Sequence, residues 1–531
     1  MANGQDTDRG PQGGPYKRKQ VGTSTTKKKD DVSTTSMAYE AMLPKWRLIE
    51  ALLGGTRAMR AASDEYLPKH EYEGKQTYEE RRDRATLLNY TRFTLNTLTG
   101  KAFREPPQLS EDAAEELKNF VEDVDGSGTG LAVFARRWFK AGLAKAMCHV
   151  LVDFSRPEET DEDRPRTKQD DEREGVRPFW MLVAPENLIF AHADLIDGRE
   201  VYTHVRIRET AVEMDGYAEV VRERIRVIEP GRFELFEMEE TKKGQRPKWV
   251  KIDDGETGVD FVPLVTFYTD REDTCEGTPP LEDLAHLNVS HFQSTSDQRA
   301  ILTVSRFAML AVAGAPATDE ETDEPLVVGP KRWLSTPDAQ GKFYYVEPQG
   351  SGIEQGWKDL SELEEQMSMY GAEFLKKRPG SVTATGRAID SSEAISPLQA
   401  MGVDFKDALE LALSYTLAWL GRNDAGADNY AVTFEVDVDV DASDGKELDT
   451  LDKARTRRDI SRETYLKELK RRGVLDDDFD ADDDKDALSD ETDDMGLFGG
   501  ETPPDDDGDE TNDDPPVDPK GQGKVKEPEV V

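Results

Sequence analysis

The sequence has few of the residues that build disulfide frameworks, zinc sites or membrane spans. Its two cysteines, Cys148 and Cys275, are far apart and fit neither a disulfide framework nor zinc-ligand spacing. The longest apolar run, near 307–315, is about half of the ~20 residues that a membrane helix needs. The opening MANGQDTDRGPQGG has no apolar segment of a signal peptide. We expect a soluble protein with reduced thiols.

Catalytic motifs are also missing from the sequence. It contains no GxxxxGK[ST] phosphate loop, which an ATP-driven packaging motor would need, and no HExxH or GxSxG. The glycine-rich GSGTG at 126–130 lacks dinucleotide-binding spacing and predicts a flexible turn. The sequence therefore predicts a protein that is not an enzyme.

The histidines and the acidic repeats give no metal-ligand pattern. His286 and His291 are five residues apart, which places them on different faces of a helix, whereas metal ligands on one helix favour i and i+4. The stretch DVDVDASDG at 437–445 resembles a calcium loop, but counting from Asp437 it has Ala442 and Leu448 where glycine and glutamate are needed. We expect no metal and no cofactor.

The charge of the chain is strongly negative and unevenly distributed. The net charge is -41, and residues 476–531 hold 23 acidic and 4 basic residues, so -19 lies there and -22 in the rest. So acidic a chain is a poor general binder of nucleic acid, because phosphate binding needs clustered Lys and Arg. We expect residues 476–531 and the Gly/Ser/Thr/Lys-rich residues 1–36 to be disordered.

The first half of the chain combines helices with strands. Apolar residues at helical spacing predict helices over 37–53, ending at Gly54-Gly55, and over 77–100 and 133–147. From 150 to 269, short Val-, Ile-, Phe- and Tyr-rich segments separated by Pro, Gly and acidic turns predict antiparallel strands. Residues 156–175 interrupt them as a charged surface loop.

The most informative segment is 278–307, which contains no glycine and predicts a long helix. Small polar residues interrupt the apolar stripe in its middle, namely Ser290, Ser294, Thr295, Ser296 and Gln298. A core helix of a monomer would keep the stripe continuous. We therefore expect this helix to pack against copies of itself around a wet axis.

The segments after residue 307 are also predicted to be helices and short strands. Residues 308–350 form a compact excursion with short strands, and a second helix with one apolar face follows from 353 to 375. After a basic loop, Ser396-Pro397 can cap and begin another helix that runs to Gly421. Alternating valines and aspartates at 430–443 predict a strand, and 446–472 is predicted helical, with Ser461 as a cap within it.

The order of these parts resembles the portal proteins of tailed bacteriophages. KWRLIEALLGGTRAMRAASDEYLP and TYEERRDRATLLNYTRFTLNTLTGKAFREPP look like the opening of a phage portal family built around a domain of unknown function. LEDLAHLNVSHFQSTSDQR looks like its first stem helix, and DISRETYLKELKRRGVLDDDFD is similar to its closing segment. The resemblance covers about residues 38–480, while the acidic tail and 156–175 fall outside it.

The resemblance implies an α+β portal fold of wing, stem, clip and crown that assembles as a ring. It assigns, in chain order, a disordered arm (1–36), the wing (37–277), stem helix 1 (278–307), the clip (308–352), stem helix 2 (353–375), the tunnel loop (376–397), the returning wing helix and strand (398–445), the crown helices (446–475) and a disordered acidic tail (476–531).

The resemblance also implies a function. Portal proteins form a ring, typically a dodecamer, at one capsid vertex, through which double-stranded DNA passes during packaging and ejection. Implied partners are further copies of the chain, the terminase large subunit, the major capsid and scaffolding proteins, and neck or head–tail adaptor proteins. The implied location is the virion, with assembly in the host cytoplasm, and no membrane is involved.

Four basic residues are candidates for contacts with the passing DNA. Lys376, Lys377, Arg378 and Arg387 lie in the segment that the resemblance assigns to the tunnel loop. A solvated loop without a DNA role explains them equally well. A translocation channel should bind DNA weakly, because each neutralised phosphate slows passage, and an acidic chain with few basic residues fits that requirement.

Three other readings of the sequence stay open. A different virion structural protein, such as a minor capsid protein or a head–tail adaptor, is the main alternative, although the length argues against a small adaptor. A nuclease or protease would need a metal or nucleophile cluster. An acidic DNA mimic would need a folded array of carboxylates, whereas the acid here is concentrated in a tail.

Overall fold

The structure of the chain is a computed structural model that describes residues 31–155, 175–196, 198–239, 248–306, 309–313, 340–346, 350–373, 396–422, 425–436, 445–471 and 475. The expectations for 1–30, 156–174 and 476–531 lie outside these ranges. The chain forms two compact units, 1–438 and 439–531, and each is described by itself.

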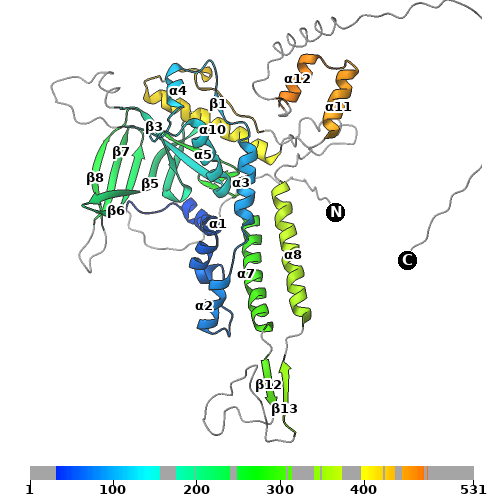
Figure 1. Cartoon of the computed structure of the whole chain (residues 1–531). Coiled ribbons are helices and arrows are strands. Elements are labelled where there is room, and N and C mark those ends of the chain that lie inside the picture. Colours follow the sequence, from blue (N-terminus) through cyan, green and yellow to red (C-terminus); the bar gives the residue numbers. More distant parts are fainter. Residues whose placement is uncertain are drawn as a thin grey trace, which may run out of the picture. The chain divides into compact units, whose positions relative to one another are not determined.

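The first unit combines helices with antiparallel sheets, as the sequence predicted, and is therefore α+β (Figure 1). Its α-helices are α1 (Met37–Ala62), α2 (Lys75–Arg84), α3 (Tyr90–Ala102), α4 (Glu115–Phe120), α5 (Leu131–Lys145), α7 (Glu282–Ser305), α8 (Gly350–Glu373) and α10 (Pro397–Trp419). Short 3-10 helices are η1 (Ser63–Glu65), η2 (Pro185–Asn187) and η3 (Ala427–Tyr430).

Two sheets make up most of the predicted β region. The three-stranded sheet has the order β3 (Pro178–Val183), β2 (Met147–Phe154), β9 (Leu264–Tyr268), and the five-stranded sheet runs β4 (Leu188–Ile196), β5 (Arg199–Asp215), β6 (Ala218–Glu229), β7 (Arg232–Glu239), β8 (Lys248–Glu256). All of these neighbouring strands pair antiparallel. The larger sheet is a meander, since its strands follow chain order.

Three small two-stranded pairings complete the first unit. They join β1 (Gln108–Leu109) to β14 (Val432–Thr433), β10 (Arg271–Asp273) to β11 (Glu276–Gly277), and β12 (Met309–Ala313) to β13 (Lys342–Val346). β13 confirms a strand expected near the end of the excursion, whereas β12 forms in an apolar run that was not predicted as a strand. The other strands expected there, at 326–333, lie outside the described residues. The expected strand at 430–443 is described only to Val436, and of it Val432 and Thr433 pair.

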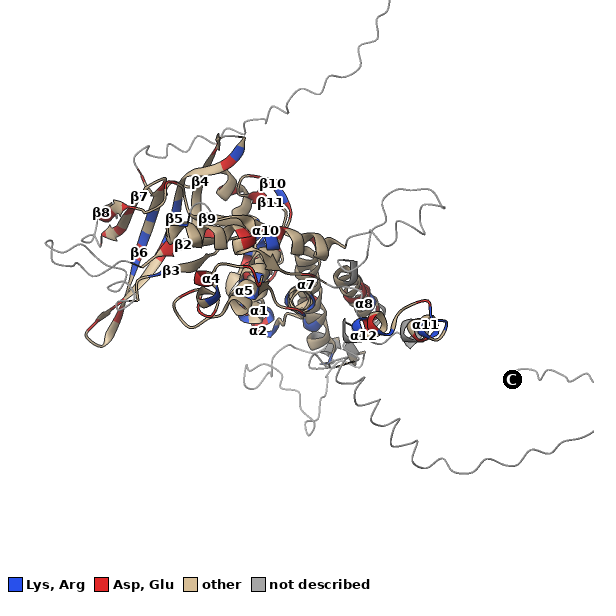
Figure 2. Cartoon of the chain, turned by 90° about the horizontal axis from the view of Figure 1, so that it is seen from above, with Lys and Arg blue, Asp and Glu red and all other residues tan. Residues whose placement is uncertain are grey.

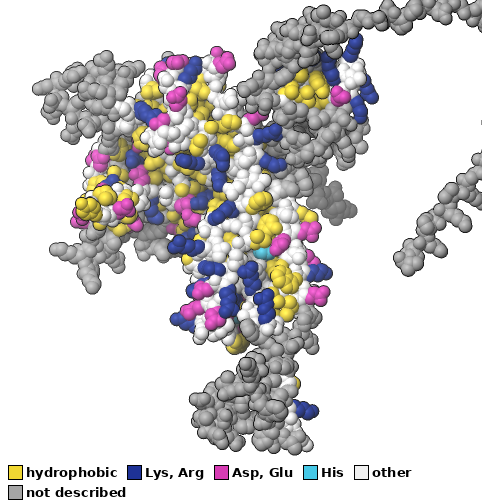
Figure 3. Space-filling view, in the orientation of Figure 1, with side chains coloured by type: hydrophobic (Ala, Val, Ile, Leu, Met, Phe, Trp, Pro, Cys, Tyr) yellow, Lys and Arg dark blue, Asp and Glu magenta, His cyan; other side chains and the backbone are white. Residues whose placement is uncertain are grey.

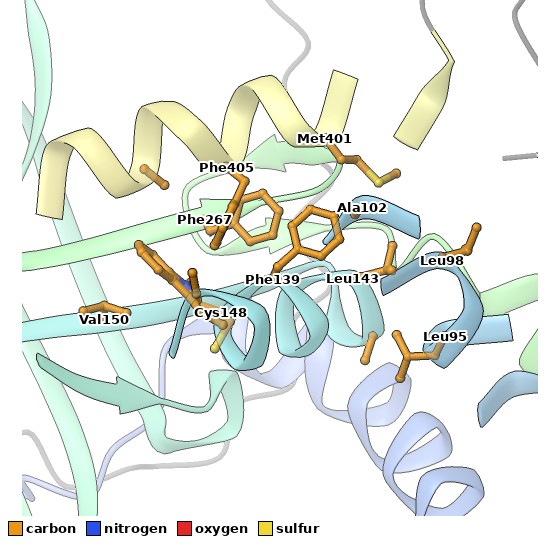
Figure 4. Close-up of a cluster of buried hydrophobic side chains, with 14 of the residues drawn as sticks. Leu95, Leu98, Ala102, Phe139, Leu143, Cys148, Val150, Phe267, Met401 and Phe405 are labelled. Atoms are coloured by element: carbon orange, nitrogen blue, oxygen red, sulfur yellow. The ribbon is translucent and has the colours of Figure 1, made fainter. Parts of the chain in front are cut away.

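Aromatic side chains from distant parts of the sequence meet between α5, α10 and the smaller sheet. Phe405 of α10 is fully buried, with its ring centroid 4.8 Å from that of Phe267, 5.2 Å from Phe139 and 5.3 Å from Trp138. Figure 4 shows Phe405 pointing from α10 toward Phe139 and Phe267. Because β2 is covered on both faces, most of its residues are buried.

The predicted helix face of α10 is confirmed. The residues in phase from Leu398 to Thr416 are buried, and Ser396 caps the helix in a capping box with Gln399, whose backbone N–H donates to Ser396 Oγ at 3.1 Å. Pro397 occupies the first turn, where its missing N–H leaves no bond unmade.

The helix end expected at Gly54-Gly55 is confirmed as a break within α1. Gly55 has the non-helical angles φ 76° and ψ -163°, and two helical segments meet there at a kink. Glycine tolerates this positive φ because it has no Cβ. The second segment, which the sequence did not predict, runs to Ala62, and its Met59 is fully buried.

The helix expected over 77–100 is two helices, α2 and α3, separated by residues 85–89. Asn89 breaks it: its side-chain oxygen accepts from Arg92 N at 2.9 Å as the cap of α3, and its Nδ2 donates to Leu52 O at 2.6 Å. Asparagine favours such caps because it bonds exposed helix N–H groups. The helix expected at 133–147 is present as α5, and Met147 already begins β2.

The second unit contains two described helices, α11 (Gly445–Thr456) and α12 (Arg462–Arg471). The continuous helix expected over 446–472 is interrupted at residues 457–461. The predicted cap is confirmed, because Thr464 N donates to Ser461 Oγ at 3.0 Å at the start of α12.

Candidate functional site

The two long helices predicted from the sequence lie side by side as an antiparallel pair. α7 and α8 have 24 residues each and are therefore about 36 Å long. His291 contacts Glu364 while Gln298, further along α7, contacts Ile353, earlier in α8, so the helices run in opposite directions. The antiparallel β12–β13 pair lies between them in the chain and extends beyond their ends (Figure 1).

Two glycines allow α8 to lie close to its neighbours. A Cβ at Gly356 would overlap the Gln298 side-chain amide of α7, and one at Gly371 would lie 3.1 Å from the Thr94 methyl of α3. Buried Leu360 and Met367 occupy the same side of α8. The covered face of α8 therefore packs against α7 and α3 within one chain.

Several polar side chains of α7 have partners inside the chain, while the expectation that this helix packs against copies of itself stays a prediction. Buried Asn288 accepts from Thr91 N and Thr91 Oγ1, both at 3.1 Å, and donates to Leu88 O at 2.8 Å. Gln293 donates to Tyr66 O at 3.0 Å, and Gln298 to Ile353 O at 2.8 Å. A polar stripe on a long helix can thus pair with backbone groups of neighbouring helices of the same chain.

A buried ion network fixes α2 against α7. Arg81 Nε lies 2.8 Å from Glu73 Oε1 and Arg81 Nη1 lies 3.2 Å from Asp297 Oδ1, while Arg81 Nη2 donates to Pro68 O at 2.9 Å. The hydrogen bond from Arg81 lowers the pKa of Glu73, and the reciprocal bond raises the pKa of Arg81. The network ties the loop before α2 to the middle of α7.

Three polar atoms between the helices have no hydrogen-bond partner among the described residues. They are His291 Nδ1, Thr295 Oγ1 and Ser296 Oγ, all on α7. His291 is buried and its Nε2 lies 3.2 Å from Glu364 Oε1, whereas His286 is exposed, so the two histidines do lie on different faces. Buried polar atoms of this kind are commonly satisfied by water.

The four basic residues proposed from the sequence lie outside the described residues. Lys376, Lys377, Arg378 and Arg387 belong to 374–395, which begins after α8 and ends before Ser396. At this end of the pair lies a cavity of about 410 Å³, lined by Asp270, Glu282, Asp283, Asp404, Tyr370 and Pro397, among others. Burial, together with nearby Asp407, raises the pKa of Asp404.

Comparisons with known proteins concern this same region. Residues 280–420, which run from the start of α7 through α10, match a family described as Domain of unknown function (DUF4055). No curated protein matches the chain.

Solved structures that resemble this chain include parts of gene transfer agent particles. A chain described as "Virion of native gene transfer agent (GTA) particle" is 11% identical, with 74% of this chain and 92% of that chain covered and a TM-score of 0.33. A chain of "Neck of empty GTA particle computed with C6 symmetry" is also 11% identical, with 74% and 91% covered and a TM-score of 0.34. TM-scores below 0.5 do not establish a shared fold.

The described residues include few groups arranged as in a catalytic site. No group of three or more His, Cys, Asp or Glu side chains is placed to hold a metal ion within the described ranges. Cys148 is buried, and burial raises the pKa of its thiol to about 12. Among the described helices, none is both long and apolar enough to span a bilayer.

Sequence reasoning missed the residues that hold the helix pair in place. Arg81 and Glu73 belong to a charged segment, 71–84, that reads as a solvated helix face. The sequence analysis did not single out Asn288 or Gln293. No local pattern distinguishes these residues from exposed ones, because their partners are up to about 200 residues away in the sequence.

Proposed function

We propose that the chain is the repeating subunit of a phage portal, a ring through which viral DNA passes at one capsid vertex. One observation carries the proposal: an antiparallel pair of long helices, joined through a small β-hairpin at one end, projects from an α+β body (Figure 1). The order of parts in the sequence, the resemblance of its motifs to a portal family and the matched domain over 280–420 point the same way.

The proposal assigns a part of the ring to each segment. The α+β body that precedes α7 would form the wing, α7 and α8 the stem, and the β12–β13 pair the clip that contacts neck proteins and the terminase. Residues 374–395 would form the tunnel loop, and α11 and α12 would belong to the crown. The role is structural, with no reaction catalysed by the chain.

Assembly into a ring is the decisive test. Native mass spectrometry of the purified chain is expected to give a single large oligomer of about twelve copies, and particle images are expected to show a central hole. Rings of this kind are closed by one repeated contact between copies. A chain that stays monomeric at high concentration and with its capsid proteins would contradict the proposal, and oligomers without a hole would favour a different virion protein.

The basic residues of 374–395 give a second test of the proposal. Replacing Lys376, Lys377, Arg378 and Arg387 with alanine is expected to leave ring formation intact and to change the rate or extent of DNA packaging, because each cation removed weakens contact with phosphate. Ring assembly and packaged DNA are measured on the same preparation. Unchanged packaging would remove these residues from the DNA path and leave the ring proposal standing.

A further inference from the structure

The outer face of α8 is acidic and has no cover within the described part of the chain. α8 contains six acidic residues and one lysine, a net charge of -5, namely Glu354, Asp359, Glu362, Glu364, Glu365, Glu373 and Lys358. Glu354, Glu362 and Glu365 are exposed, and they form no ion pair among the described residues. Their spacing of eight and three residues places them on one side of the helix.

Large apolar side chains accompany these carboxylates on α8. Trp357 is 52% exposed and Met369 is 60% exposed, although the opposite side of the helix buries Leu360 and Met367. Spacing along the sequence places Trp357 on the same helix face as Leu360 and Met367, but in the structure Trp357 is exposed. An exposed tryptophan among charges is typical of the anchor of a protein interface.

A patch of arginines lies on the other side of the helix pair. It consists of Arg57 and Arg60 of α1, Arg92 of α3 and Arg299 of α7. Arg60 Nε donates to Ala85 O at 2.8 Å, Arg299 Nη1 donates to Thr86 Oγ1 at 3.0 Å, and Arg92 donates to Leu53 O. These bonds gather the guanidinium groups of Arg60, Arg92 and Arg299 around residues 53 and 85–86, and exposed Arg57 lies three residues before Arg60 on α1. Figure 3 shows Lys and Arg side chains gathered over α2, α3 and α7 on this face.

None of the four arginines has a carboxylate partner among the described residues, unlike neighbouring Arg81. Phe93, 68% exposed, and Leu88, 47% exposed, add apolar area beside the patch. The arginine patch therefore has the complementary composition to the outer face of α8: cations with exposed apolar side chains against carboxylates with exposed apolar side chains.

The two surfaces cannot satisfy each other within one chain. α7 contacts both α2 and α8, which lie on opposite sides of it in Figure 1, so the patch and the outer face of α8 lie on different sides of the pair. Seen from above in Figure 2, α2 and α8 again lie on different sides of α7. Two different surfaces on opposite sides of one subunit are the requirement for a head-to-tail contact that closes into a ring.

We propose that the outer face of α8 of one copy binds the arginine patch of the next copy. The occupant of each surface is therefore a second copy of this chain. The inference rests on the proposed ring and identifies the contact that closes it. Carboxylates and guanidinium groups that become desolvated together steer association and fix the register of neighbouring copies.

The experiment uses charge reversal on each surface separately. One full-length variant carries Glu362→Lys and Glu365→Lys, and another carries Arg57→Glu and Arg299→Glu. Each variant alone is expected to need at least about tenfold more protein for half-assembly, since each lost contact of about 1.4 kcal/mol gives a factor of ten. Assembly is followed by native mass spectrometry and particle images, and folding by circular dichroism.

Mixing the two variants gives the sharpest outcome. In a ring that alternates the two chains, every lysine-bearing α8 faces a glutamate-bearing patch and every native α8 faces a native patch. The mixture is therefore expected to assemble within about threefold of the wild-type concentration, because opposite charges meet again at every contact. A control with Glu111→Lys and Asp112→Lys, two exposed carboxylates before α4, should assemble like the wild type.

Different results overturn different claims. Wild-type rings together with full assembly of each reversed variant would overturn this interface and leave the ring proposal intact. A mixture that fails to assemble although both variants are folded would also overturn it. Arginine variants that assemble normally but retain less DNA would assign the patch to phosphate instead. A wild-type chain that never assembles would overturn both proposals.

Discussion

Replacing Phe405 with alanine is expected to lower the free energy of unfolding of the chain by about 3–5 kcal/mol. The ring is fully buried and lies against the aromatic rings of Phe267, Phe139 and Trp138. Its loss removes apolar contacts that join α10 to α5 and to β9 and leaves a cavity that this packed cluster cannot fill by local collapse. Urea unfolding measures the change.

A matched control comes from another phenylalanine. Phe93 of α3 is 68% exposed, so Phe93→Ala is expected to change stability by no more than about 0.5 kcal/mol. Both variants are compared with the wild type at one chain concentration, because self-association makes apparent stability depend on concentration. A loss for Phe405→Ala no larger than that for Phe93→Ala would mean that α10 does not anchor the core.

Periodicity was enough to predict α10 and the antiparallel strands. The apolar positions of α10 recur at helical spacing from Leu398 to Thr416, and Ser396 with Pro397 gives a local start signal. The β region is dense in residues that favour strands, and its turns are marked by glycine and proline. In both cases the pattern of buried residues agrees with the capping or turn residues beside it, so a short stretch of sequence is enough to predict the element.

The errors occur where tertiary contacts override a local signal. Gly55 breaks the helix as predicted, but a second helical segment with buried Met59 follows the break directly. Asn89 resembles one more polar helix residue, yet its side-chain oxygen accepts from Arg92 N as the cap of α3 and its Nδ2 donates to Leu52 O. In each case the deciding partner belongs to another turn or another helix, which spacing along the sequence cannot reveal.

The interpretation of α7 shows the same limit for the candidate site. An interrupted apolar stripe predicted a surface between copies, which stays a prediction, but one residue of that stripe, Gln298, bonds to Ile353 O of the same chain. Within the described residues, the outer side of α8 and the surface around Arg299 are also exposed. Polarity in the sequence indicates that a residue needs a partner but not which chain supplies it.

Replacing Arg81 with methionine is expected to lower the free energy of unfolding by about 3–5 kcal/mol, as for other buried ion pairs that lose one member. The Arg81 and Glu73 side chains are only 5% and 7% exposed, so the substitution leaves the Glu73 carboxylate buried without a cation. The backbone carbonyl of Pro68 also loses its donor. Urea unfolding at pH 7 measures the loss.

The double variant Glu73→Gln with Arg81→Met separates the buried charge from the lost contacts. Because the amide carries no charge, the double variant is expected to recover a substantial part of the stability that Arg81→Met loses. A double variant that is as unstable as Arg81→Met would show that packing of the arginine, and not the unpaired carboxylate, accounts for the loss.

The pH dependence of folding stability tests independently whether Arg81 keeps Glu73 charged. In the wild type the pKa of Glu73 is lowered, so the pair stabilises the fold above the usual glutamate pKa of about 4.3 and this contribution is lost as the pH falls through the folded-state pKa. In Arg81→Met, burial without the cation raises the pKa of Glu73, and protonation then relieves the destabilisation. The stability gap between wild type and Arg81→Met is therefore expected to narrow on acidification from pH 7 to pH 4. A gap that stays constant or widens would mean that Glu73 does not depend on Arg81 for its charge.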